Sequence, residues 1–182
     1  NMSLGTNQLF TSTCDDYSSW TRSLANAVNQ LNDRGVTIFA SSGNDGDNTA
    51  ITAPACLTNV IAVGATWDDR ISNYTGLCTE LSPVAGEITC FSNSSDNVDI
   101  FAPGALITST GLNNGISNFA GTSMASPLVA SCAALLRQSK PTITPLELRN
   151  ALVENGGAIV TDSTGRSFPS LDCWQAYSSL PS

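Results

Sequence analysis

The sequence predicts an α/β fold in which a mostly parallel β-sheet is packed between helices. Two short apolar runs rich in β-branched residues, 36–40 and 60–63, have the length and composition of buried strands. Helical patterns flank them, and the segment 124–137 is the longest. Strands that alternate with helices favour a parallel sheet that is covered on both faces.

Each further element has its own signal in the sequence. A helix near the N-terminus is predicted because four apolar residues recur at helical spacing: Trp20, Leu24, Val28 and Leu31. Gly35 supplies its C-terminal stop. A third, shorter strand is predicted at 98–101. The segment 124–137 is apolar on nearly all sides of a helix, so we expect it to be buried.

The last predicted helix begins at a capping box. Thr144 and Glu147 have the spacing at which each side chain caps the main chain of the other. Pro145 stands at the first helical position, where its missing N–H has no helical role. We expect this helix to run to Asn155 and to end at the glycine pair 156–157.

The composition excludes several classes of function. Among 182 residues there are 7 basic and 15 acidic side chains, a net charge of −8. Nucleic acids and anionic membranes require a basic surface, so we expect neither as a partner. The uncharged stretch 100–136 is interrupted by proline, glycine and asparagine and predicts no membrane span. The chain has no histidine and so cannot hold a complete Ser-His-Asp site by itself.

The six cysteines contain no CxxC pair, which argues against a zinc or redox site. Their even number favours disulfides and a secreted or extracytoplasmic protein, with reduced buried thiols as the alternative. The spacing of Cys78 and Cys90 predicts that they close one small loop, so we expect a surface insertion at 76–91. The remaining pairs, assigned by proximity alone, are then Cys14–Cys56 and Cys132–Cys173.

The sharpest chemical signal is the motif GTSMASP at 121–127. Its glycine allows a tight turn, after which Ser123 stands at the start of the predicted buried helix. Main-chain N–H groups at a helix N-terminus lack helical acceptors and can stabilise an anion that forms on a substrate carbonyl. Pro127 is expected to cost little, because we place it in the first helical turn. A serine or threonine N-cap without a catalytic role explains the short motif equally well.

A second signal is the segment ASSGNDG at 40–46, directly after a predicted strand. Sites in open α/β sheets form beyond the carboxyl ends of the strands. A side-chain amide at that edge can donate a hydrogen bond to a developing oxyanion, and Asn44 is the candidate. By itself, the segment is more typical of a simple turn.

Five sequence blocks, in order, resemble the subtilisin-like serine proteases, the subtilases, over most of the chain. The blocks are NMSLG at 1–5, SSGN at 41–44, AP at 53–54 with NVIAVGA at 59–65, DIFAPG at 99–104 and GTSMASP at 121–127. Five ordered blocks are far more specific than any one motif. The resemblance implies that 1–182 is the C-terminal part of one three-layer subtilisin-like domain, with a mostly parallel sheet between helices.

The resemblance also implies roles for individual residues. Ser123 would be the nucleophile of a serine endopeptidase, and Asn44 with the Ser123 N–H would form the oxyanion hole, assisted by Thr122. The residues implied to bind a peptide or protein substrate are Ser3, Leu4, Gly5, Ser41, Ser42 and Gly43. The first three would pair with an extended substrate backbone as an added strand. The other three would flank the substrate side chain before the cleaved bond, in a roomy pocket.

The catalytic aspartate and histidine of the family lie in its N-terminal half, to which this sequence has no counterpart. We therefore expect the isolated chain to be inactive by the triad route and an N-terminal fragment of the same protease to supply both residues. The segment 1–5 resembles the end of a buried strand, where a natural domain seldom begins, so we expect polypeptide before it. A truncated chain and a histidine-free pseudoenzyme are the alternatives.

The resemblance requires no cofactor for the chemistry. Because relatives often bind calcium, a structural calcium ion is left open, and no metal ligand can be assigned. Sedolisins, which use a Ser-Glu-Asp site, offer a second interpretation, but their oxyanion residue is an aspartate at the position of Asn44. A non-catalytic binding domain is the third, although a dead site need not keep Ser123, Asn44 and Thr122.

Overall fold

The computed structural model describes residues 1–155 and 157–180. Its centre is a parallel sheet of three strands in the order β2–β4–β7, formed by Ile38–Ser41, Val60–Trp67 and Ile100–Ala105. Met2 extends this sheet beyond β2 by a single parallel bridge to Ala40. The three strands therefore share one carboxyl edge, at which the chain leaves the sheet three times.

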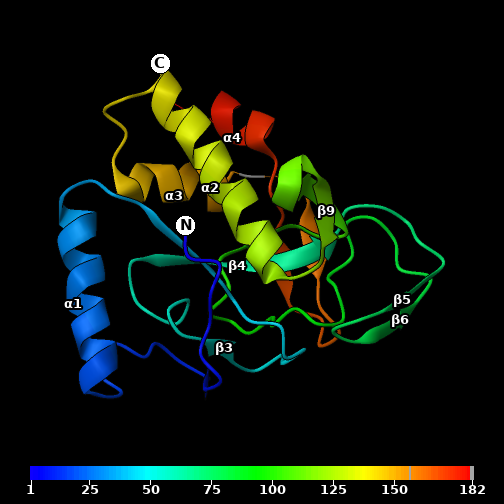
Figure 1. Cartoon of the computed structure of the whole chain (residues 1–182). Helices are drawn as coiled ribbons and strands as arrows, with labels where there is room; N and C mark the ends of the chain where they lie inside the picture. The colour runs from blue at the N-terminus through cyan, green and yellow to red at the C-terminus, as the bar shows by residue number, and fades with distance from the viewer. Residues whose placement is uncertain (156, 181–182) are drawn as a thin grey trace.

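Helices cover both faces of the sheet. The helices are α1 (Ser19–Asp33), α2 (Thr122–Ser139), α3 (Pro145–Val153) and α4 (Cys173–Ser178). In Figure 1, α2 runs diagonally across the molecule with α3 and α4 beside it, whereas α1 stands apart at the left. Side chains of α1 pack in one apolar core, and those of α2 and α3 pack in a second core on the other face. The architecture is thus three layers, as the sequence predicts.

The strands are mainly apolar because both faces of the sheet are buried. All eight residues of β4 are buried. Along β2, Ile38 belongs to the core that contains α1, and its neighbour Phe39 belongs to the core that contains α2. Such double burial explains why a parallel strand shows a continuous apolar run in place of alternation. The predicted α/β fold with a parallel sheet between helices is confirmed.

The boundaries of the strands differ from those predicted. β2 begins at Ile38, later than the predicted start of 36–40, and β4 is four residues longer than predicted. The third strand, predicted at 98–101, is β7 and begins at Ile100. The N–H of Val98 closes a turn onto the carbonyl of Ser95 at 2.9 Å and therefore precedes the strand.

The helix predicted at 124–137 is α2, which is longer at both ends. One of its sides is fully buried, at Ala125, Val129, Cys132 and Leu136. The prediction that this helix is buried on nearly all faces is wrong, because Leu135 is 60% exposed. Pro127 is the sixth residue of α2 and does not lie in the first turn, contrary to the prediction.

The other two predicted helices begin with a capping box. Ser18 accepts a hydrogen bond from the N–H of Thr21, and Gly35 follows the end of α1 with a φ of 81°. Thr144 and Glu147 cap α3 reciprocally, as predicted. α3 ends at Val153, two residues before the expected end, and residue 156 of the predicted glycine stop lies outside the described residues.

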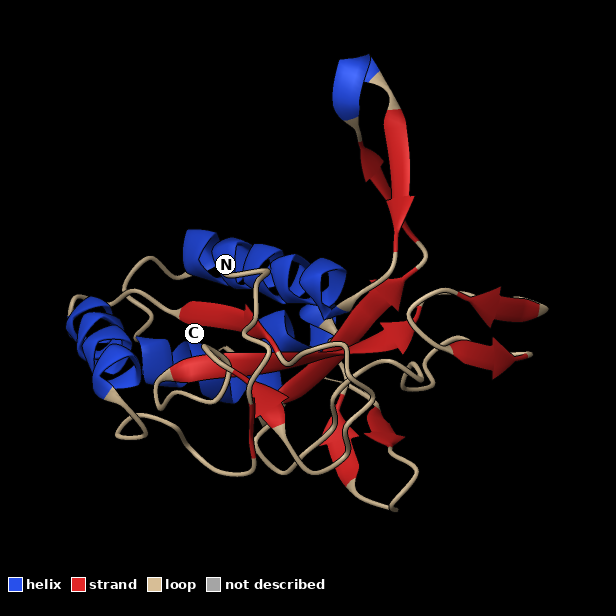
Figure 2. Ribbon diagram, turned by 60° about the horizontal axis from the view of Figure 1, so that its bottom comes forward, coloured by secondary structure: helices blue, strands red, loops and turns tan. Residues whose placement is uncertain are grey.

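Four two-stranded antiparallel pairs surround the central sheet. They are β1 (Leu9–Phe10) with β3 (Ile51–Thr52), β5 (Asn73–Thr75) with β6 (Thr79–Leu81), β8 (Ile107–Thr110) with β9 (Ile116–Phe119), and β10 (Ile159–Thr161) with β11 (Ser167–Pro169). The β8–β9 hairpin, with a 3₁₀ turn at its tip, extends away from the body of the molecule in Figure 2. None of these pairs has a continuous apolar run, and none was predicted.

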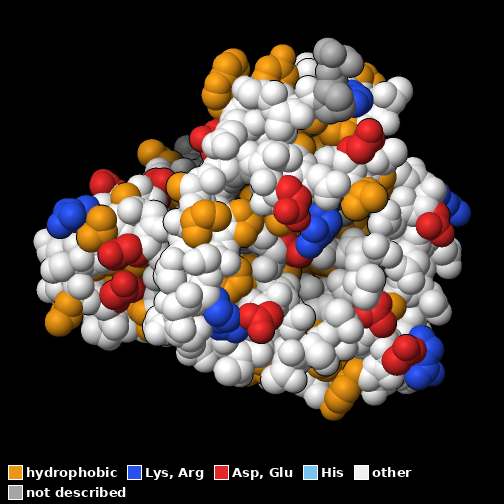
Figure 3. Space-filling view, turned by 180° about the vertical axis from the view of Figure 1, so that it is seen from behind, with side chains coloured by type: hydrophobic (Ala, Val, Ile, Leu, Met, Phe, Trp, Pro, Cys, Tyr) orange, Lys and Arg blue, Asp and Glu red, His pale blue; other side chains and the backbone are white. Residues whose placement is uncertain are grey.

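Three disulfides connect the pairs that the sequence predicts: Cys14–Cys56, Cys78–Cys90 and Cys132–Cys173. The second closes the expected loop at 76–91, where β6 lies, and the third ties α2 to α4. On the face shown in Figure 3, basic and acidic side chains are scattered among hydrophobic side chains, other side chains and main chain. No helix among the described residues combines the length and the apolar character needed to cross a bilayer.

Candidate active site

The candidate residues meet at the carboxyl edge of the parallel sheet. Beside β2, the N–H of Met2 donates to the carbonyl of Phe39 at 2.8 Å, and the N–H of Ser41 donates to the carbonyl of Met2 at 3.3 Å. At the same edge, the N–H of Gly121 donates to the carbonyl of Gly104 at 2.7 Å. These bonds bring the segment after Met2, the end of β2 and the start of α2 to one place.

Ser123 is the second residue of α2, so its N–H belongs to the first four of the helix, which have no helical acceptor. Pro127 has no N–H to donate to the carbonyl of Ser123, and the hydroxyl of Ser3 donates to that carbonyl at 2.7 Å. Asn1 supports this arrangement, because its amide nitrogen donates to the Ser3 hydroxyl at 2.9 Å. The Oγ of Ser123 lies 3.5 Å from the carbonyl oxygen of Ser3, at the limit of a hydrogen bond.

Asn44 is held against the start of α2 by its side-chain oxygen. Its Oδ1 accepts hydrogen bonds from the N–H of Thr122 at 2.8 Å and from the hydroxyl of Thr122 at 2.9 Å. Because these two bonds fix the oxygen, they also fix which way the amide nitrogen points. That nitrogen has no acceptor among the described residues and is available to a ligand.

A cavity of about 200 Å³ opens beside Ser123. It is lined by Leu4, Gly5, Thr6, Ser41, Gly43, Asn44, Asp45, Thr52, Thr122 and Ser123. Two candidates for substrate binding do not line it. Ser42 is fully buried and its hydroxyl donates to the carbonyl of Asn93 at 3.1 Å, whereas Ser3 lies against Ser123.

Three lining residues were missed in the sequence. Thr52 reaches the cavity because β3 returns to β2, and its N–H donates to the carbonyl of Ser42 at 2.9 Å. Asp45 follows Asn44 directly and places a carboxylate in the lining, and Thr6 follows the predicted segment 1–5. In the sequence, these three residues are marked only by their position next to predicted site residues or sequence blocks.

At Gly43, the wall of the cavity consists of main chain alone, because the residue has no side chain. Its φ is 118°, a conformation that side chains other than hydrogen rarely allow. A Cβ at this position would lie 2.3 Å from Nδ2 of Asn93 and 2.9 Å from Cγ2 of Thr52. The hydroxyl of Ser41, which also lines the cavity, is buried and has no hydrogen-bond partner among the described residues.

Two buried carboxyl groups near the sheet have opposite pKa shifts. Burial alone would raise the pKa of Asp162, but hydrogen bonds from Thr164 and Arg166 outweigh it and hold the pKa well below its usual range. Its partner, Nη2 of Arg166, lies 2.7 Å from Oδ2 of Asp162, whose side chain is 2% exposed. At the amino end of β7, burial raises the pKa of Asp99 in spite of its ion pair with Arg149.

These shifts predict how stability depends on pH. A carboxyl group whose folded pKa is lowered stabilises the fold above its unfolded pKa of about 3.9 and loses that effect as pH falls through the folded pKa. We therefore expect Asp162→Asn to make the free energy of unfolding less dependent on pH between about pH 5 and 2. Asp99→Asn is the matched control with the opposite sign, because a carboxyl group whose folded pKa is raised destabilises the fold as pH rises above its unfolded pKa of about 3.9. Urea unfolding at several pH values measures both slopes, and equal slopes would contradict the assignment.

Among residues 1–155 and 157–180, no three or more cysteine, aspartate or glutamate side chains lie close enough to hold a metal ion. We assign no metal ligand.

The three-layer α/β architecture, with a serine at the N-terminus of a helix beside an anchored asparagine amide, is the organisation of the subtilisin-like fold. The chain belongs to the subtilase family, whose family model matches residues 1–169. It is 35% identical over 155 residues to the minor extracellular protease Epr of Bacillus subtilis, covering 85% of this chain and 20% of that protein. It is 36% identical over 152 residues to the alkaline elastase YaB of a Bacillus species, covering 84% of this chain and 33% of that protein.

Solved structures give the same assignment. The prenylagaramide maturation protease PagA superimposes with a TM-score of 0.76 and 28% identity over all of this chain and 62% of that chain. A cold-adapted subtilisin-like serine proteinase superimposes with a TM-score of 0.71 and 31% identity, over 94% of this chain and 53% of that chain. The chain thus spans a fifth to a third of the two curated relatives and over half of the two solved chains.

Proposed function

We propose that this chain provides the nucleophile, the oxyanion donors and the substrate-binding segment of a secreted serine endopeptidase. The observation that carries this proposal is the anchoring of the Asn44 oxygen by Thr122, which leaves the amide nitrogen free beside Ser123. The family membership supports it, as do the names of the relatives, which include an extracellular protease and an elastase. The three disulfides support an oxidising compartment.

In the proposed mechanism, the Oγ of Ser123 attacks the carbonyl carbon of a peptide bond. The carbonyl oxygen gains negative charge and accepts hydrogen bonds from Nδ2 of Asn44 and from the N–H of Ser123. The proton taken from Ser123 passes to the leaving nitrogen, and collapse of the tetrahedral intermediate then expels the amine and leaves an acyl group on Ser123, which water removes as the carboxylic acid. The substrate runs beside Leu4 and Gly5, and its side chain before the cleaved bond enters the cavity.

A general base must remove the proton from Ser123, and the printed sequence has no histidine. We propose that the histidine and its aspartate come from an N-terminal part of the same protease, as a preceding segment or a separate fragment. No metal or other cofactor enters these steps. The subtilase family match favours this site over a sedolisin-type Ser-Glu-Asp site, and Asn44 stands where that site requires an aspartate.

A fluorophosphonate probe tests the proposal on the native protein, without separation of its chains. Labelling that mass spectrometry confines to Ser123 is the expected result, because the probe reacts only with a serine that has a functioning base. The matched control is Ser131, which is exposed on the same helix and should stay unlabelled. No labelling of Ser123 between pH 4 and pH 10 would reject the proposed activity.

Asn44→Ala is expected to lower kcat by about 10²- to 10³-fold, as the loss of one oxyanion donor does in subtilisin, a member of the same family. KM should change little, because the amide acts on the charged intermediate more than on the substrate. Asn48→Ala, in the same loop, is the control and should retain the activity. A change confined to KM would assign Asn44 to substrate binding.

A further inference from the structure

The oxyanion amide of the proposed site stands on a segment that has no regular structure. Residues 42–50, here called the oxyanion loop, connect the end of β2 to β3. Within the loop, one carboxylate oxygen of Asp47 accepts hydrogen bonds from the main-chain N–H groups of Thr49 and Ala50. Those bonds order only the second half of the loop, so the half that carries Asn44 depends on contacts from elsewhere.

Asn93 supplies contacts on both sides of Asn44. It is fully buried, and its Oδ1 accepts hydrogen bonds from the N–H groups of Asp45 and Asp47, at 3.0 and 3.1 Å. Its Nδ2 donates to the carbonyl of Ser42 at 3.2 Å and to the carboxylate of Asp45 at 3.1 Å. The main-chain N–H of Asn93 also donates to the carbonyl of Gly43 at 3.1 Å. One side chain therefore holds the residues before and after Asn44.

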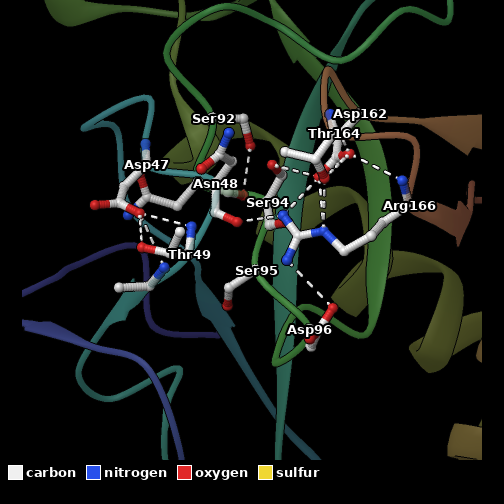
Figure 4. A network of polar contacts seen from close by, with 12 residues as sticks. Asp47, Asn48, Thr49, Ser92, Ser94, Ser95, Asp96, Asp162, Thr164 and Arg166 are labelled. Carbon is white, nitrogen blue, oxygen red and sulfur yellow. Dashed lines mark hydrogen bonds and ion pairs between the residues drawn. The ribbon is translucent and has the colours of Figure 1, made fainter.

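Arg166 holds the far end of the oxyanion loop to the segment that contains Asn93. Its guanidinium donates to the carbonyl oxygens of Asn48 and Ser94, the latter at 2.5 Å. Figure 4 shows the guanidinium between these two segments, with Asp162 on one side and Asp96 on the other. Arginine is suited to this position, because its planar group offers five donors in fixed directions.

The carboxylate of Asp162 keeps the guanidinium in place. It accepts hydrogen bonds from Nε and Nη2 of Arg166 at 3.0 and 2.7 Å, and from the hydroxyl of Ser94 at 3.1 Å. Its other oxygen is occupied by Thr164, so the carboxylate cannot rotate away. The β10–β11 hairpin, about 120 residues after the loop, is thereby attached to the back of the proposed site.

We propose that Asn93 and Arg166 are positioning residues for the oxyanion amide of Asn44. Neither lines the cavity or touches Ser123. Asn93 sets the path of the main chain around Asn44, and Arg166 fixes the loop and the Asn93 segment in one arrangement. The proposal deepens the proposed function and depends on it for its catalytic consequence, whereas the order of the loop can be measured independently.

The first experiment measures hydrogen exchange of the oxyanion loop by mass spectrometry in the native protein. In Asn93→Ala and Arg166→Gln, peptides that cover 42–50 should exchange faster, because the N–H groups of Asp45 and Asp47 lose their acceptor or its support. Arg149→Gln is the matched control, since it removes a guanidinium with a buried carboxylate partner at the opposite edge of the sheet. If Asn93→Ala and Arg166→Gln fail to fold, the same exchange measurement is made on Arg166→Lys. Unchanged exchange in the folded variants would overturn the proposal even for an inactive protein.

The second experiment measures kinetics in the active protein. Arg166→Gln should lower kcat about tenfold, the order of magnitude known for residues that support metal ligands, with little change in KM. In an Asn44→Ala background the same substitution should have no further effect on kcat, because the positioned amide is gone. An equal loss in both backgrounds would mean that Arg166 acts on general stability and would overturn the proposal. A wild-type protein that does not label at Ser123 rejects the proposed function, while the exchange measurement still decides the order of the loop.

Discussion

Replacing Ser123 by alanine is expected to remove nearly all peptidase activity of the native protein. In subtilisin, a member of the same family, loss of the nucleophile lowers kcat by about 10⁶-fold, which sets the expected size. The small residual rate comes from the oxyanion donors and substrate binding, which the substitution leaves in place. Substrate affinity should change little, because the cavity loses a single hydroxyl group.

Steady-state kinetics on a chromogenic peptide checks this result, with labelling by the fluorophosphonate probe as a second readout. Ser131→Ala removes a hydroxyl from the exposed side of the same helix and should retain full activity. A Ser123→Ala protein that keeps more than a few per cent of the activity, free of contaminating protease, would place the nucleophile elsewhere.

Removing the disulfide Cys132–Cys173 is expected to have a large effect on stability, similar by loop length to that of removing Cys14–Cys56. It joins α2, which carries Ser123, to α4, across a separation of 41 residues. The chain-entropy model gives a loss of about 4 kcal/mol in the free energy of unfolding for a closed loop of this length. Alanine at both positions is the suitable change, because Cys132 is 3% exposed and a serine hydroxyl would be buried there.

Urea unfolding of the native protein measures this loss. The pair Cys78–Cys90, with a separation of 12 residues, is the comparison, and the same model gives about 3 kcal/mol for it. A smaller loss for Cys132–Cys173 than for Cys78–Cys90 would mean that the chain-entropy model does not describe these disulfides.

The central sheet could be predicted because its strands have no polar face. The strands β2 and β4 are buried on both sides and are therefore mainly apolar, without an alternation of apolar and polar residues. The β8–β9 hairpin was not predicted, because its strands contain serine, threonine and asparagine beside few apolar residues and are largely exposed. The dipeptide Asn114-Gly115, which is typical of hairpin turns, stands directly before β9, at the end of the connection 111–115.

Those residues of the candidate site that stand in the five sequence blocks could be predicted. Asn44 and Ser123 stand in such blocks, and the structure brings both to one cavity. The sequence around Asn93 and Arg166 does not indicate their proposed role, because that role depends on bonds to residues about 50 and 120 positions away. Hydrogen bonds between residues so far apart in the sequence depend on how segments such as the β10–β11 hairpin pack against the oxyanion loop. They produce no periodic pattern in the sequence.

Pro127 links the capture of a peptide to the placement of the nucleophile. Since it cannot donate to the carbonyl of Ser123, that carbonyl is bound instead by the hydroxyl of Ser3, in the segment proposed to receive the substrate. The segment proposed to receive the substrate is therefore hydrogen-bonded directly to the main chain of Ser123. The placement of the proposed nucleophile thus depends on a contact between two segments 120 residues apart in the sequence.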